Sequence, residues 1–107
     1  MSNNAALTDI GTTRSEVGSY ARKWLDFMVE HHPDLVWEMT KSETLEAVAQ
    51  SVDDTAWNYH DLLEKQYAEA HRRPKTFEEI VKWEYTRAFY VNGAVMREKV
   101  LIPITTA

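Results

Sequence analysis

The sequence predicts an all-α protein, and three observations support this prediction. A Thr-x-x-Glu pattern occurs three times, and in such a capping box the threonine side chain accepts from the backbone N–H three residues on. Apolar residues recur at helical spacing after each box. Glycine and proline number only three each among 107 residues, which argues against a turn-rich β protein. The three boxes are Thr13 with Glu16, Thr40 with Glu43, and Thr76 with Glu79.

We therefore expect a small antiparallel helical bundle of four or five helices. The bundle domain is predicted over residues 13–98. Residues 1–12 are polar and without period, which predicts a flexible N-terminal arm. Residues 99–107 are predicted to form an extended C-terminal tail that either packs back on the bundle or docks elsewhere.

The first helix is predicted over residues 14–30, because Tyr20, Trp24 and Met28 fall on one helical face. It should end before Pro33, since the residue preceding a proline is pushed away from helical angles. Pro33 itself suits a first helical position, so a short helix through Met39 is expected next.

A long helix is predicted over residues 41–71, about 46 Å if it is continuous. Its apolar residues form a heptad-like seam. Cap-forming residues near Val52 would allow a break, but the seam keeps its phase across them and favours a bent or continuous helix. A turn at residues 71–75 should follow. The seam consists of Leu45, Ala49, Val52, Ala56, Tyr59, Leu63, Gln66 and Ala70.

The last helix begins at the Thr76 box, and its apolar residues point in nearly every direction, which predicts the central helix of the bundle. Asn92 and Gly93 are expected to stop or interrupt it, because both tolerate the left-handed conformation of a helix end. Alternatively, residues 89–96 fit a β-hairpin with a type I′ turn.

The composition excludes several classes of function. The chain has no cysteine, so disulfides and thiolate chemistry are absent. It lacks an apolar run of about 20 residues and a secretory signal at its N-terminus, so no membrane association and cytoplasmic residence are expected. No glycine-rich phosphate loop, nucleophile elbow or zinc-protease motif occurs. We therefore expect neither an enzyme nor a bound cofactor.

The net charge of −5 is unevenly distributed. Between Asp26 and Glu69 the only lysines or arginines are Lys41 and Lys65. This acidic stretch should repel nucleic acid and attract basic protein surfaces. The later basic cluster at residues 72–75 is too small to bind duplex DNA against these acids, so direct nucleic-acid binding is not expected.

These features predict a small acidic protein-binding module, an adaptor or inhibitor of a basic and possibly nucleic-acid-handling partner, encoded by a phage or other mobile element. The long helix should present its carboxylates, with two tryptophans as anchors, because tryptophan is enriched at binding hot spots. The predicted partner-binding residues are Asp53, Asp54, Trp57, His60, Asp61, Glu64 and Trp37.

Two other functions compete with this one. The heptad-like seam with its polar Gln66 would suit a structural homo-oligomer, such as a homodimer. His60 and Glu64, four residues apart, would suit a metal-binding protein or metal-dependent enzyme if His31 or His32 supplied a third ligand. Polar pairs on a solvated helix surface are the favoured explanation of His60 and Glu64, because such i, i+4 pairs are common. Glu84 and Arg87 are predicted to form an ion pair.

Overall fold

The computed structural model describes residues 19–105, and within this range the chain forms four α-helices and one short π-helix without any strand. The predicted all-α fold is confirmed. The predicted arm at 1–12 and the first capping box lie outside the described residues. The elements are α3 (Ser19–His31), α4 (Pro33–Lys41), α5 (Leu45–Ala70), α6 (Phe77–Val95) and the π-helix η1 (Met96–Val100).

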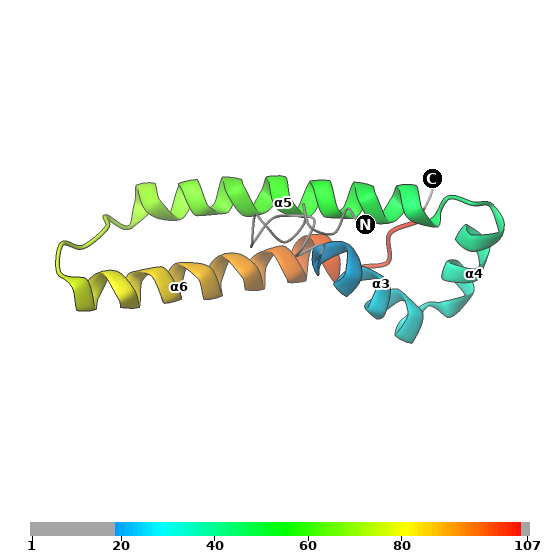
Figure 1. Cartoon of the computed structure of the whole chain (residues 1–107), viewed down its shortest axis with the longest axis horizontal. Helices are drawn as coiled ribbons and strands as arrows, with labels where there is room; N and C mark the ends of the chain where they lie inside the picture. Colours follow the sequence, from blue (N-terminus) through cyan, green and yellow to red (C-terminus); the bar gives the residue numbers. More distant parts are fainter. Residues whose placement is uncertain (1–18, 106–107) are drawn as a thin grey trace, which may run out of the picture.

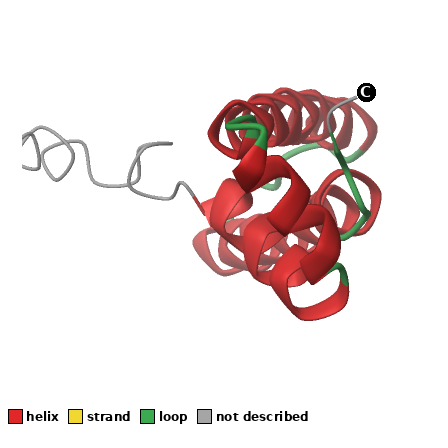
Figure 2. Cartoon of the chain, turned by 90° about the vertical axis from the view of Figure 1, so that its right-hand side faces the viewer, coloured by secondary structure: helices red, strands yellow, loops and turns green. Residues whose placement is uncertain are grey.

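The two longest helices, α5 and α6, run antiparallel as a hairpin that spans the long axis of the molecule (Figure 1). At one end α3 packs against α5 and η1, and α4 connects α3 to the start of α5. Figure 2 looks along the long axis with this thicker end toward the viewer. In the described part of the chain, the opposite end consists of the hairpin, closed by the turn at residues 71–76. No helix among residues 19–105 is both long and apolar enough to cross a membrane.

The short helix predicted at Pro33 is confirmed as α4, with proline in its first turn. The prediction that Thr40 and Glu43 form a capping box at the start of a helix is wrong. Thr40 lies inside α4 and its hydroxyl donates to the carbonyl of Val36 at 2.8 Å. Glu43 has a φ of 60°, and the N–H of Thr44 donates to the carbonyl of Met39 at 2.9 Å. This is the helix-ending arrangement that usually carries glycine at the left-handed position, so the Thr-x-x-Glu spacing here marks a helix end.

Helix α5 is continuous from Leu45 to Ala70, as the unbroken phase of its seam favoured. Val52, Ala56 and Leu63 are buried against the rest of the chain. The seam therefore packs on α3 and α6 of its own chain, which removes its central part as a free surface for a second copy.

Helix α6 begins at the predicted capping box: Thr76 Oγ1 accepts from the N–H of Glu79 at 3.4 Å. The expected stop at Asn92 and Gly93 is wrong, and so is the alternative hairpin, because α6 runs through both residues and continues into η1. Helical spacing carries Val91 and Val95 into the core, and both are fully buried. The burial gained by these residues outweighs the local preference of Asn-Gly for a turn.

The core lies at the thick end, where α3, α5, η1 and the C-terminal half of α6 meet. Trp24 and Met28 of α3 are fully buried there, and so is Val100 of η1. The tail is helical through Val100, one residue beyond its predicted start, and Ile104 then packs back on this core. Helix α6 is not central, because its N-terminal half contributes only Trp83 as a buried residue.

Candidate functional site

Asp53, one of the predicted partner-binding residues, is buried rather than exposed. Only 7% of its surface is accessible, and its Oδ1 accepts from the backbone N–H of Ala21 in α3 at 3.3 Å. A carboxylate in this position satisfies a helix N–H and complements the positive end of a helix. Asp53 therefore joins α5 to α3, and the expectation that it forms part of an exposed acidic band is wrong.

Trp57 and His60 also face α3, where they surround Tyr20. The Tyr20 ring lies 4.9 Å from the Trp57 ring and 6.4 Å from the His60 ring, and its hydroxyl donates to Oδ1 of Asn92 in α6 at 3.1 Å. Burial of Tyr20, together with the negative charge of Glu64, raises the pKa of its hydroxyl above the usual 10.0. This cluster holds three helices together.

Glu64 lies beside a cation from the neighbouring helix. Arg87 of α6 places its Nε 4.0 Å from Oε2 of Glu64 and its Nη2 2.6 Å from Oε1 of Glu84. The guanidinium also lies 4.9 Å from the centre of the Trp83 ring. The predicted ion pair of Glu84 and Arg87 is confirmed, and Arg87 cancels part of the negative charge predicted for this face of α5.

His60, Asp61 and Glu64 bring possible ligand atoms within 4.8 Å of one another. The third ligand that a metal site was expected to recruit, His31 or the adjacent His32, does not reach them. His31 closes α3, whereas His60 contacts the beginning of the described part of that helix, so about 16 Å of helical rise separates them. The guanidinium of Arg87 beside Glu64 also opposes a second cation. The three side chains are explained as polar pairs on a helix surface.

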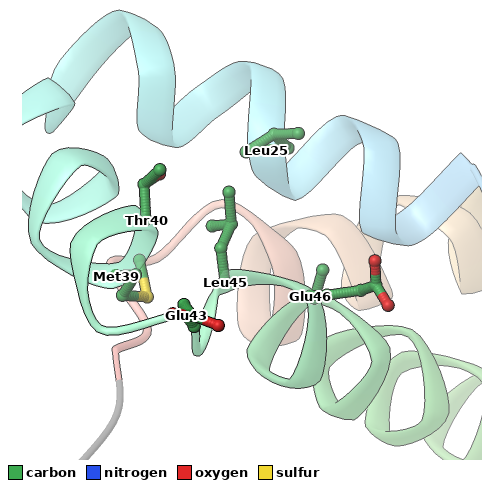
Figure 3. Close-up of a pocket in the computed structure, with 7 residues that line it drawn as sticks. Leu25, Met39, Thr40, Glu43, Leu45 and Glu46 are labelled. Atoms are coloured by element: carbon green, nitrogen blue, oxygen red, sulfur yellow. The ribbon is translucent and has the colours of Figure 1, made fainter.

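A hollow of about 570 Å³ lies where α3, α4 and α5 meet (Figure 3). Its apolar wall includes Leu25, Met39 and Leu45, and Leu45 extends toward Leu25 across it. The side chains of Glu43 and Glu46 border it at the start of α5. Sequence reasoning missed this site because it placed Glu43 inside a helix rather than in the turn between two helices.

Trp37, the other predicted anchor, is exposed as expected. It lies on α4 with 61% of its surface accessible, and Nζ of Lys41 lies 5.9 Å from its ring. Two carboxylates of the predicted set, Asp54 and Asp61, are also exposed. Asp54 accepts from Nε2 of Gln50 at 3.0 Å, and Asp61 lies 3.2 Å from Nδ1 of His60. The predicted set is thus divided between exposed residues and residues that connect the helices.

Helix α6 exposes a row of apolar residues that sequence reasoning assigned to the core. Phe77, Tyr85 and Phe89 are between 73% and 85% accessible, and Val81 between them is 36% accessible. Their spacing of four residues was the available signal, because it places all four on one side of a helix. Trp83 and Val91, which face the opposite side, are the residues that this helix buries.

Comparison with known proteins identifies the family of this chain. Residues 6–101 match the sequence model of a family described as transposon-encoded protein TnpV. The chain belongs to the TnpV family. The match includes every helix of the described structure, and no curated protein or solved structure matches. Membership in the TnpV family agrees with the prediction of a small protein encoded by a mobile element.

Proposed function

We propose that this member of the TnpV family is a protein-binding module, an adaptor or inhibitor whose acidic end docks on the basic surface of a DNA-handling protein. The observation that carries this proposal is the hollow between α3, α4 and α5, which combines an apolar floor with carboxylates at its border. Transposition requires proteins that handle DNA, and their DNA-contacting surfaces are basic. Such a partner would place the chain in the cytoplasm.

The electrostatics of the thick end support a basic partner. Exposed cations between residues 20 and 61 are limited to Arg22, Lys23 and Lys41, and η1 adds exposed Arg97 and Glu98, whose charges are opposite. A surface with this excess of negative charge attracts a basic protein at long range and accelerates its association, and salt weakens both effects. The exposed carboxylates of this region are Asp26, Glu30, Asp34, Glu38, Glu43, Glu46, Asp54 and Asp61.

The hollow and Trp37 offer apolar contacts to a partner, in addition to the attraction between charges. A volume of about 570 Å³ accommodates one large apolar side chain of a partner with room for neighbouring atoms. Trp37 offers a large exposed ring on the adjoining helix α4. Glu43 keeps its carboxylate at the border despite a φ of 60°, where glycine would be less strained, and backbone strain of this kind concentrates at functional sites.

Affinity capture with matched variants tests this proposal. The full chain is immobilised, exposed to lysate of a cell that carries the element, and treated with nuclease to remove contacts bridged by DNA. We expect a basic protein to remain bound at low salt and to be released at high salt. The triple variant W37A/E43Q/E46Q should no longer capture this basic protein. The control variant E78Q/E79Q removes the same number of negative charges from α6 and should still capture it.

The variants also define the results that contradict the proposal. Equal capture by E43Q/E46Q with W37A and by E78Q/E79Q would show that the thick end is not the docking surface. Capture that disappears with nuclease would show that the chain reaches its partner through nucleic acid. If the immobilised chain retains no specific protein from the lysate, the docking function is contradicted.

A further inference from the structure

The outer side of α6 carries a row of apolar side chains that nothing in residues 19–105 covers. Phe77 is 79% accessible, Tyr85 is 73% and Phe89 is 85%, with Val81 between them. Single exposed apolar residues are ordinary on protein surfaces, but a contiguous row of aromatic residues marks an interaction surface. We call these four residues the α6 row.

The arrangement of the helices leaves space beside the α6 row. The described neighbours of α6 are chiefly α5 and η1, and Trp83 faces inward to this side. Among residues 19–105, the thin half of the molecule is a two-helix hairpin without a third helix (Figure 1). The molecule measures 54 × 32 × 20 Å, and its radius of gyration of 16.5 Å exceeds the roughly 13 Å of a compact domain of this length.

We propose that the α6 row binds a second copy of this chain, so that two hairpins pack antiparallel through their α6 helices. The row is symmetric about position 83. An antiparallel pair centred there places Phe77 opposite Phe89 of the second copy, and Val81 opposite its Tyr85. Every apolar residue of the row then meets an apolar residue, as a two-fold symmetric interface requires.

A shallow hollow next to the row offers a place for side chains of the second copy. It has a volume of about 380 Å³ and is lined by Ile80, Val81, Glu84, Tyr85 and Ala88. The small side chain of Ala88 lies one turn from Glu84 and leaves room for an aromatic ring. Packing of large residues into such hollows is how helices of a bundle interlock.

The charge distribution favours a second copy and sets its direction. The turn between the hairpin helices is basic, with Arg72, Arg73 and Lys75 exposed. The thick end of the molecule carries the excess of carboxylates described above. An antiparallel pair directs the basic turn of each copy toward the acidic end of the other, whereas a parallel pair would bring the two basic turns together.

The area that the row offers is of the order a dimer needs. A fully exposed aromatic side chain contributes roughly 150–250 Å², so the three aromatic residues at their observed accessibility offer about 400 Å² in each copy. Two copies would bury about 800 Å² through these residues alone. Val81 and the lining of the adjoining hollow would bring the total toward the roughly 1,200 Å² of a specific interface.

Sedimentation equilibrium of the full chain tests the association. We expect a mass of twice the 12.5 kDa of one chain at concentrations of tens of micromolar. The double variant Y85E/F89E should sediment as one chain while its circular dichroism keeps the helical content. The control L62E changes an exposed leucine on α5 that is 48% accessible, and it should remain a dimer.

Two results would overturn the association. Wild-type protein that stays monomeric to several hundred micromolar would show that the α6 row has another occupant, such as a helix of a different protein. A dimer that survives in Y85E/F89E would show that a different face of the molecule associates. Because the row is distinct from the hollow at the thick end, this proposal and the docking proposal can fail separately.

Spin labels test the direction of the pair. The chain has no cysteine, so K82C and K75C each create a single labelling site. In the antiparallel pair the two labels at position 82 lie near the symmetry axis and should give a short distance. At 1.5 Å per residue the two labels at position 75 should be displaced by about 24 Å along the helices. Short distances at both positions would indicate a parallel pair and overturn the antiparallel arrangement.

Discussion

Replacement of Asp53 by alanine should destabilise the fold much more than the same change at its neighbour Asp54. The Asp53 carboxylate is buried and accepts from the N–H of Ala21 at 3.3 Å. A hydrogen bond to a charged group contributes about 1.5–3 kcal/mol, and D53A would leave the Ala21 N–H without this acceptor. We therefore expect D53A to lower the free energy of unfolding by about 2 kcal/mol and the melting temperature by about 10 °C.

Urea unfolding followed by circular dichroism measures this difference, with D54A as the matched control. Asp54 is exposed and accepts from Gln50 of the same helix, so D54A should cost less than about 0.5 kcal/mol. D53N keeps an oxygen acceptor without the charge and should fall between wild type and D53A. If D53A and D54A unfold at the same urea concentration, Asp53 does not connect α5 to α3, and the assignment of its role is wrong.

Further predictions concern the core, the turns and pH. M28A should lower the unfolding free energy by about 2–5 kcal/mol because Met28 is fully buried, whereas V29A at a half-exposed position should cost under about 0.5 kcal/mol; thermal unfolding compares the two. G93A should raise the unfolding free energy by about 0.5–1 kcal/mol, because its Cβ would have ordinary contacts in a helix; a loss would indicate a turn at Gly93. E43G should stabilise by up to about 1 kcal/mol in urea unfolding because φ is 60° there; destabilisation would contradict the left-handed conformation. Burial, and secondarily the charge of nearby carboxylates, raises the pKa of the Tyr20 hydroxyl above 10.0 in the folded state. The contribution of Tyr20 to stability is therefore present below pH 10 and is lost as the pH rises through the raised pKa. Unfolding of Y20F as a function of pH should therefore show a smaller loss of stability at alkaline pH than wild type, and equal losses would contradict this role.

The fold class and the long helices could be predicted from local signals. The Thr76 box forms a real capping interaction, because the hydrogen bond from the N–H of Glu79 to Thr76 Oγ1 depends only on residues three positions apart. Pro33 opened α4 for a similarly local reason, its fixed φ. The continuous phase of the α5 seam predicted an unbroken helix because the same apolar face packs along its length.

Errors arose where tertiary contacts reverse a local preference. Thr40 and Glu43 have the spacing of a helix start, but the burial of Met39 ends α4 there and uses the same residues in a helix-ending turn. Gly93 remains helical because Val91 and Val95 on either side are buried. Neither outcome follows from the spacing of residues nearby in the sequence.

The site was predictable in kind but not in detail. Exposure of Trp37 and Asp61 followed from their positions outside the seam. The burial of Asp53 depended on an N–H of α3, a contact between residues 32 positions apart. The aromatic residues of α6 point in nearly every direction on a helical projection, and only the arrangement of the hairpin shows that Phe77, Tyr85 and Phe89 remain exposed.

Hydrogen–deuterium exchange on the captured complex locates the docking surface on the chain. It compares the full chain alone with the chain bound to its partner at the same concentration. We expect peptides spanning residues 37–46 to gain protection on binding, and peptides spanning residues 77–89 to remain unchanged. Protection confined to residues 77–89, or no protection at residues 37–46, would contradict a docking surface at the acidic end.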